Sequence, residues 1–460
     1  MARKTRELFV FAHLAEQAAG RFVPAGILTL TESVGTGARS RELASSFAYG
    51  TGYLKRPQAI EVDPVSLGIA DREAVAGKAF YPVNGLEEFG GIRDAAPDAW
   101  GRRVIEARHK APANSLMEAD YLLEAGGDRV GALDVRETRT SPDSTSASDI
   151  HSLGYVLQAA EAVEYGMPVP AKLQDFLGAG PSAGGARPKA SVRDDDGALW
   201  LAKFPAKGDT YDVARAESCT LELARRCGLT VPQLRYLDLG GRPVMLIRRF
   251  DRYWAAASAA PAAAIASYDG RPGPGLVEGR LAFASGLTLV ACSEFESRAK
   301  GYGDLALAVR KYVHPRSIRR NGEELFARMV FNIFVSNDDD HLRNHGFVRN
   351  PHLGGWTLSP LYDVVPRPGV AYERMLHLEV GEKGKLATLD NALSHFTAFT
   401  ADRSVALGLI RQVWGQVRQW KTCFEELGAS GALIDTLTPA FRELAHIAST
   451  PLIAEIRRAE

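Results

Sequence analysis

Cysteine is scarce in this sequence, and its placement excludes one kind of site. The 460 residues contain four cysteines, Cys219, Cys227, Cys292 and Cys423. None of them forms a C-x-x-C pair or another spacing typical of metal ligands. Such a pattern indicates reduced, buried thiols rather than a secreted disulfide scaffold. We therefore expect a cytoplasmic protein without a cysteine-based metal site.

Long apolar runs and a surplus of one charge are also missing. No run of eighteen apolar residues occurs, so we expect no membrane-spanning helix. Lysine plus arginine and aspartate plus glutamate both number 55, which gives a formal net charge of zero. Because affinity for duplex DNA depends on counterion release by basic side chains, we expect little DNA affinity from the chain alone. A local basic patch, such as Arg102, Arg103 and Arg108, stays open.

A complete phosphate-binding motif is missing as well, although one segment is rich in glycine. Residues 178–186 contain four glycines, including Gly184 and Gly185, and one serine, Ser182. Glycine lets backbone N–H groups converge on phosphate oxygens without steric penalty. The segment matches neither G-x-G-x-x-G nor G-x-x-x-x-G-K-[ST], so a flexible linker is also open. Its position shortly before Lys203 is where a kinase carries its phosphate-covering loop.

The length of the chain predicts two or three domains, and the pattern of elements predicts an α+β fold. We divide the sequence into an N-terminal α+β domain (1–110), a helical connection and linker (111–170), a mixed region with the glycine loop, lysine strand and hinge (171–280), and a helical region (281–460). Within these we expect strands at 8–13, 25–30 and 47–54, a helix start at 97–105, an Asp-Gly hairpin at 192–200, a helix at 213–227, and an apolar helical stripe at 325–333.

The most informative segment is the acidic loop Asn337–Phe347, which follows that apolar stripe. It holds three adjacent aspartates, two asparagines and two histidines. Carboxylates this close repel one another unless a cation or a reacting proton offsets the repulsion. Asp339 and Asn344 have the aspartate-to-asparagine spacing of a kinase catalytic loop. We expect Asp338 and Asp340 to cap helices or to pair with Arg343.

Kinase logic assigns a role to each polar residue of this set. Asp339 would deprotonate the attacking hydroxyl, and Asn344 and the later Asp363 would hold Mg²⁺. Lys203, inside the strand-like run 199–204, would contact the nucleotide phosphates, with surface snorkelling as the alternative. His341 is placed beside the nucleotide, where it braces the loop by hydrogen bonds.

Two further segments have competing interpretations. The strand 245–252 is either the inter-lobe hinge, with Arg249 and Phe250 beside adenine, or an ordinary strand end with charged flanks. His341 and His345 have the four-residue spacing of zinc hydrolases. The residue after His341 is Leu342 rather than the glutamate that such enzymes use as a base, which disfavours zinc.

With these motifs the chain resembles the HipA family of toxin serine/threonine kinases, nearly from end to end. Residues 89–103 resemble the family's N-terminal domain, and residues 182–189 resemble its serine-bearing glycine loop. Residues 246–252, 337–347 and 358–364 are similar to its hinge, catalytic loop and metal-binding segment. One departure is Arg248, which stands where a glutamate often precedes the Arg-Phe pair, so only backbone recognition of adenine is expected there.

The resemblance implies an ATP- and Mg²⁺-dependent protein kinase with an eccentric, two-lobed kinase-like fold. It implies that Asp339 is the catalytic base, that Asn344 and Asp363 bind Mg²⁺, and that Ser182 is autophosphorylated to switch the enzyme off. It also implies a small helix-turn-helix antitoxin, HipB-like, as a partner, and an aminoacyl-tRNA synthetase as a possible class of substrate. A small-molecule phosphotransferase and a non-catalytic co-repressor subunit stay open as alternatives.

Overall fold

The chain is described from a computed structural model, which describes residues 3–14, 20–34, 41–143, 148–174, 185–256, 272–350 and 353–458. Ser182 and Gly184 lie outside the described residues. The fold divides into two compact units. Unit 1 comprises residues 1–207, 246–291 and 348–354, and unit 2 comprises 208–245, 292–347 and 355–460. The four-part division made from the sequence stays a prediction.

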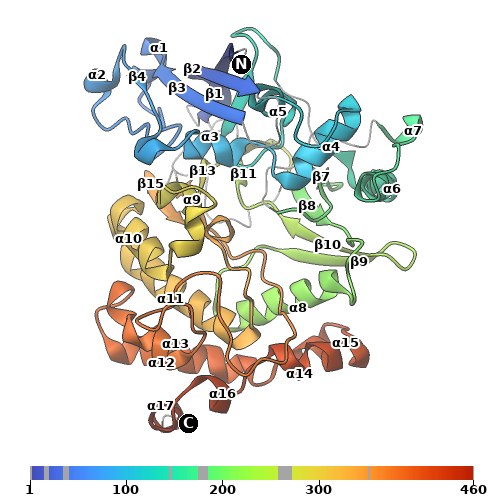
Figure 1. Cartoon of the computed structure of the whole chain (residues 1–460), viewed down its shortest axis with the longest axis vertical. Coiled ribbons are helices and arrows are strands. Elements are labelled where there is room, and N and C mark those ends of the chain that lie inside the picture. The colour runs from blue at the N-terminus through green and yellow to red at the C-terminus, as the bar shows by residue number, and fades with distance from the viewer. Residues whose placement is uncertain are drawn as a thin grey trace. The chain divides into compact units, whose positions relative to one another are not determined.

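Unit 1 begins with an antiparallel sheet of five strands in the order β4-β3-β2-β1-β5. Figure 1 shows β1, β2 and β3 lying side by side. The strands are β1 Arg3–Leu14, β2 Arg21–Val34, β3 Arg41–Tyr49, β4 Ala79–Phe80 and β5 Leu133–Arg136. The predicted strands at 8–13 and 25–30 are thereby confirmed. The predicted strand 47–54 is wrong beyond Tyr49, because the backbone N–H groups of Tyr53 and Leu54 turn back to the Gly50 carbonyl and form a helical turn.

Helices and a second set of strands complete unit 1. The helices are α1 Thr51–Leu54, α2 Arg72–Val75, α3 Gly90–Ala95, α4 Ala99–His109, α5 Glu118–Glu124, α6 Leu153–Glu164, α7 Ala171–Gln174 and α9 Gly286–Leu289. The strands are β6 Ser148–Asp149, β7 Lys189–Arg193, β8 Leu199–Lys203, β11 Arg252–Ala256, β12 Leu276–Arg280 and β13 Phe283–Ser285. The Asp-Gly hairpin is confirmed as β7 and β8, with Gly197 at φ +82° in its turn.

Unit 2 is mainly helical. Its helices are α8 Val213–Arg226, α10 Tyr302–Tyr312, α11 Ile318–Val335, α12 Leu389–Ser394, α13 Arg403–Val417, α14 Trp420–Glu426, α15 Gly431–Leu437, α16 Leu444–Ile447 and α17 Thr450–Arg457. Strands β9 Leu234–Asp238 and β15 Gly355–Leu358 belong to this unit, while β10 Pro243–Arg248 and β14 Gly346–Asn350 contribute residues to both units. Among the described residues, none of the helices has the length and apolar character that a bilayer crossing requires.

Helix α11 positions the acidic loop. From Leu325 to Val335 every one of its side chains is buried, so the predicted apolar stripe is one part of a fully enclosed helix end. The helix ends at Ser336, which adopts the left-handed conformation at φ 52°. The Ser336 hydroxyl donates to the Ala440 carbonyl at 2.6 Å, which anchors the point where the chain leaves the core.

Candidate catalytic loop and nucleotide-binding segments

A buried chain of hydrogen bonds holds the acidic loop to unit 2. The Asn337 amide donates to the Asn332 side chain at 3.1 Å, and the Asn332 amide donates to the Tyr302 hydroxyl at 2.9 Å. The Tyr302 hydroxyl donates to the Asp340 carboxylate at 2.6 Å. The backbone N–H of His377 donates to the other oxygen of Asp340 at 2.9 Å. These side chains are satisfied inside the protein, so they fix the loop backbone rather than contact a ligand.

Asp340 is the enclosed carboxylate of the three aspartates. It is 1% exposed, and burial raises the pKa of its carboxyl group to about 7 against the opposing effect of the hydrogen bonds from Tyr302 and His377. The prediction that Asp340 caps a helix or pairs with Arg343 is therefore wrong. Arg343 instead pairs with Glu294 at 2.6 Å.

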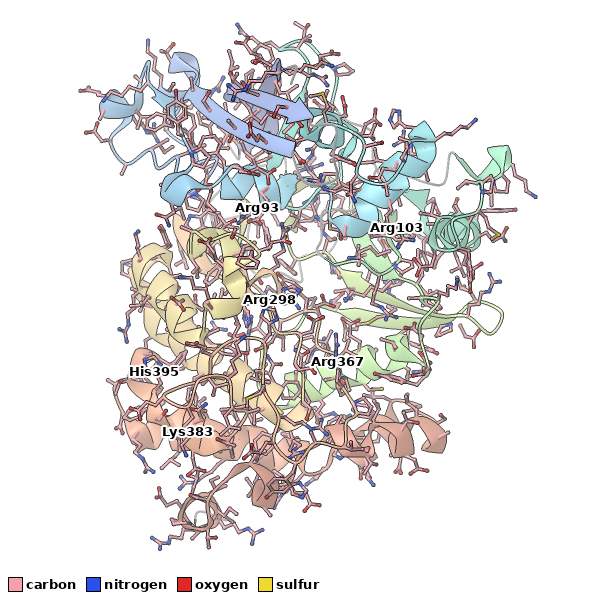
Figure 2. All side chains as sticks on the ribbon, in the orientation of Figure 1. Arg93, Arg103, Arg298, Arg367, Lys383 and His395 are labelled. Carbon is pink, nitrogen blue, oxygen red and sulfur yellow. The ribbon has the colours of Figure 1, made fainter. Side chains whose placement is uncertain are left out.

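Asp338 and Asp339 are the exposed carboxylates of the loop, at about half of their full exposure. The Arg367 guanidinium bridges them, with Nε 3.0 Å from Asp338 and a terminal nitrogen 3.0 Å from Asp339. Arg367, labelled in Figure 2, lies on the segment that follows Asp363. This partner of the two aspartates was not predicted from the sequence, although an arginine four residues after Asp363 was a visible signal. The exposed pair can therefore exchange its cation for a substrate or a metal ion without opening the core.

The amide of Asn344 is oriented by the loop itself. Asn344 is 6% exposed, and its Nδ2 donates to the backbone carbonyl of Asp339 at 2.9 Å. Because the nitrogen is engaged in this bond, the amide oxygen is the atom left for a ligand. An amide oxygen is the type of hard donor that Mg²⁺ accepts.

The segment that carries Asp363 runs along the acidic loop within unit 2. The backbone N–H of Ser359 donates to the Gly346 carbonyl at 2.8 Å, and the Tyr362 hydroxyl donates to the Arg343 carbonyl at 2.7 Å. Arg367 closes the other side by its contact with Asp339. Asp363 itself has φ +59°, an uncommon conformation for a residue other than glycine. Strained backbone of this kind is concentrated at functional sites, which motivates a role for its carboxylate.

The two histidines of the loop do not form a zinc site. His345 is 1% exposed and packs edge-on against the Tyr302 ring, and burial lowers its pKa to about 3. His341 precedes the short 3-10 turn Leu342–Asn344 and packs edge-on against the His377 ring. The described residues contain no group of three or more His, Cys, Asp or Glu side chains able to hold a metal ion. The zinc alternative therefore has no support here.

In unit 1, the residues predicted to contact the nucleotide include Lys203 at the end of β8. Lys203 is half-buried, and it stands opposite Lys189 in the β7–β8 pair. Lys189 is 4% exposed and its ammonium group binds the Asp98 carboxylate at 2.8 Å. Trp100 ties the same segment to α4, since its indole N–H donates to the Lys189 carbonyl at 2.8 Å.

Gly185 is the described residue at the end of the glycine-rich segment. Its φ of +94° favours glycine, and an added Cβ would approach the Lys189 ammonium nitrogen at 3.2 Å. The backbone N–H of Trp100 donates to its carbonyl at 3.4 Å. The buried Lys189–Asp98 pair that fixes this end of the loop was not predicted from the sequence.

The predicted hinge is engaged inside unit 1. The Arg249 guanidinium binds both oxygens of Asp251 at 2.6 and 2.8 Å and the Asp128 carbonyl at 2.9 Å, and its backbone N–H donates to the Leu199 carbonyl. A nucleotide contact by Arg249 would therefore have to use its carbonyl oxygen. The Phe250 ring packs against Phe283 and the apolar cluster around Tyr253.

Comparison with known proteins gives the family. The HipA-like C-terminal domain family matches residues 181–421, which is more than half of the chain. The chain belongs to the HipA family. The match includes residues 182–189, 246–252, 337–347 and 358–364, which are four of the segments that carried the resemblance, while residues 89–103 lie outside it. No curated protein matches the sequence.

A solved structure of a similar protein supports the fold of this HipA family member. HipA in the complex of HipA, HipB and operator DNA from Shewanella oneidensis MR-1 is similar with a TM-score of 0.63 at 14% identity, over 98% of this chain and 97% of that chain. The proinflammatory kinase CtkA of Helicobacter pylori is also similar, with a TM-score of 0.40 at 14% identity, over 60% of this chain and 94% of that one. The expected α+β fold of the family is confirmed.

Proposed function

We propose that this HipA family member is an ATP-dependent serine/threonine protein kinase that acts as the toxin of a toxin–antitoxin pair. One observation carries the proposal. Asp339 presents an exposed carboxylate on a loop that the buried hydrogen bonds of Asn337 and Asp340 hold in place. A general base needs this combination of a positioned backbone and an accessible carboxylate.

Asp339 would accept the proton of the attacking hydroxyl once Arg367 has moved aside. Asn344 and Asp363 would hold Mg²⁺, and their amide and carboxylate oxygens fit a cation that takes one or two protein ligands and completes its shell with phosphates and water. The ion would neutralise charge that develops on the transferring phosphoryl group. In unit 1, Lys203 would contact nucleotide phosphates, and the Arg249–Phe250 segment would lie beside adenine.

The family resemblance motivates our proposals on the regulation and the partners of this protein. Ser182 is proposed as an autophosphorylation site that switches the kinase off, because phosphate there would add about −1.5 to −2 charges to the glycine-rich segment. A small helix-turn-helix protein, HipB-like, is proposed as the antitoxin, since the similar Shewanella structure contains HipA, HipB and operator DNA. An aminoacyl-tRNA synthetase is the proposed class of substrate.

The test is a phosphoryl-transfer assay with radiolabelled Mg-ATP on candidate proteins and on the chain itself. Transfer to serine or threonine that is lost in Asp339→Asn supports the proposal. Mass spectrometry of the product then locates any phosphate on Ser182. Transfer only to small molecules would replace the proposal with a small-molecule phosphotransferase, and absence of transfer with a correctly folded chain would leave the co-repressor alternative.

A further inference from the structure

A groove of about 880 Å³ lies in unit 2 beside the segment that follows Asp363. One wall is formed by residues 369–374, and the others by the ends of α13 and α17, by the start of α14 and by residues 438–446. Figure 1 shows α14, α16 and α17 within this helical part of the unit. Two contacts link the groove to the candidate catalytic loop: the Arg374 guanidinium donates to the Arg367 carbonyl at 3.0 Å, and Arg367 binds Asp339.

The charge lining the groove is strongly unbalanced. The described lining residues include a single carboxylate, that of Glu443, and five cations, which are Arg374, Arg418, Lys421, Arg442 and Arg457. A cavity lined by one sign of charge concentrates ligands of the opposite sign. The groove therefore favours an anionic occupant.

Two of the arginines are held in place by neutral groups. Arg442 is 9% exposed, donates to the Tyr372 carbonyl at 2.5 Å, and has no hydrogen-bond partner for its buried Nε. Arg374 donates to the carbonyls of Gly369 and Pro439. Burial lowers the pKa of both guanidinium groups, and the charge of Arg374 lowers that of Arg442 further. Their charges are thus positioned but not neutralised by a contacting carboxylate.

We propose that this groove binds an acidic segment of the phosphoacceptor protein and so presents its hydroxyl to Asp339. The inference rests on the proposed kinase function and names the class of its substrate. Exposed apolar side chains at the rim, Val370 and Tyr372, would contact the same segment beside its acidic residues. Single-stranded nucleic acid needs several exposed rings on which successive bases stack, whereas Tyr372 is the one large exposed aromatic side chain among the described lining residues, and this favours a peptide. Trp420 is 7% exposed and stacked on Phe441 at 3.8 Å, so its face is already covered.

Direct binding tests the groove without reference to catalysis. The probe is a fluorescein-labelled peptide Glu-Glu-Glu-Glu-Ala-Ser-Ala, and its matched control carries glutamine in place of glutamate. Fluorescence anisotropy with the full chain, without nucleotide, should show at least about tenfold tighter binding of the acidic peptide. The double variant Lys421→Glu/Arg457→Glu should remove that preference. Arg316→Glu/Arg320→Glu changes the net charge equally outside the groove lining and should retain it.

Phosphorylation of the two peptides separates the groove from the kinase assignment. The proposal expects a lower KM for the acidic peptide, lost in the groove variant. Two results would show that the groove does not bind the acidic peptide, even if Asp339-dependent phosphorylation occurs. One is equal binding of the two peptides, and the other is equal loss of the preference in the control variant. Groove-dependent binding without any phosphorylation overturns the kinase assignment for this substrate class. If oligouridylate displaces the acidic peptide and binds with higher affinity, the groove binds RNA rather than an acidic protein segment.

Discussion

The segment 249–252 and the adjacent pair Asp338 and Asp339 both concentrate charge, yet they use it in opposite ways. In the first, Asp251 is 1% exposed and accepts from Arg249, Arg252 and the backbone N–H of Gly131. Although burial raises it, the charges of the two arginines hold the pKa of Asp251 well below its usual range. In the second, the Asp338 and Asp339 carboxylates are about half exposed, and both pair with the guanidinium group of one long side chain, that of Arg367.

The difference shows that charge density by itself does not identify a functional site. Buried carboxylates with two or more fixed donors are part of the scaffold, because removal of one partner leaves an uncompensated buried charge. Exposed carboxylates held by one exchangeable cation are available for chemistry, because an exposed pair contributes little to stability. The number of fixed partners, rather than the residue type, separates the two roles.

The largest expected effect is on the stability of unit 1 in Asp251→Asn. Loss of this carboxylate leaves Arg249 buried without an anion and leaves Arg252 with only Glu278 at 3.4 Å, and we expect a destabilisation of roughly 3–5 kcal/mol. Urea unfolding followed by circular dichroism measures it. The matched change Asp338→Asn should cost at most about 1 kcal/mol. Equal costs for the two variants would remove the distinction between the segments.

The second effect is on catalysis in Asp339→Asn. If Asp339 is the general base, phosphoryl transfer should fall by at least about 10²-fold while the unfolding midpoint hardly changes. The kinase assay and the urea titration are made on the same preparation. Near-normal turnover in this variant would show that the exposed pair is a surface feature and that the base lies elsewhere.

Local periodicity and spacing predicted much of this from the sequence. Helices α8 and α11 follow from apolar periodicity, and the β7–β8 hairpin follows from an Asp-Gly turn. The acidic loop was located by the density of its carboxylates. These signals are contained in a few neighbouring residues, so a single sequence displays them.

Long-range partners could not be predicted in the same way. Nothing near Asp340 indicates that Tyr302, thirty-eight positions away, binds its carboxylate, or that Asp98 pairs with Lys189. The expectation that Arg343 pairs with the loop aspartates relied on short separation along the chain, whereas the structure gives it Glu294. Which charges are buried depends on such tertiary pairings, and so the roles of the three aspartates separated only in the structure.

A smaller effect is expected in Arg367→Ala. Arg367 binds the Asp339 oxygen that would accept the substrate proton. Its removal should raise kcat/KM by up to about fivefold, which corresponds to the free energy of an exposed ion pair. Steady-state kinetics with Arg367→Lys as the charge-retaining control measure this, and Lys should keep the wild-type value. A fall of tenfold or more would instead show that Arg367 stabilises the transferring phosphoryl group.

The smallest net effect is expected in the pH dependence of wild-type stability, because the two units contribute to it with opposite sign. In unit 1, burial and then the charges of Arg280 and Arg252 lower the pKa of His13 from 6.5 to about 3. Between these values the unfolded chain carries the extra proton, so the contribution of His13 to stability is lost as pH falls from about 6.5. In unit 2, the pKa of Asp340 is raised from 3.8 to about 7, so the folded protein carries the extra proton. Its contribution is lost as pH rises toward 7.

Each contribution is isolated by the difference between wild type and one variant. Urea midpoints at several pH values from 4.5 to 8 are compared for His13→Phe, which keeps the edge contact with Phe22, and for Asp340→Asn, which keeps the size of the side chain. Relative to wild type, His13→Phe should become more stabilising as pH falls, and Asp340→Asn should become more stabilising as pH rises. The two dependences oppose each other over the same pH window. The urea midpoint of the wild type should therefore change less with pH than the difference between the midpoints of the two variants. Differences that change with pH in the same direction would mean that Asp340 stays ionised in the folded protein, and that the buried and exposed aspartates of the loop are less distinct than their partners indicate.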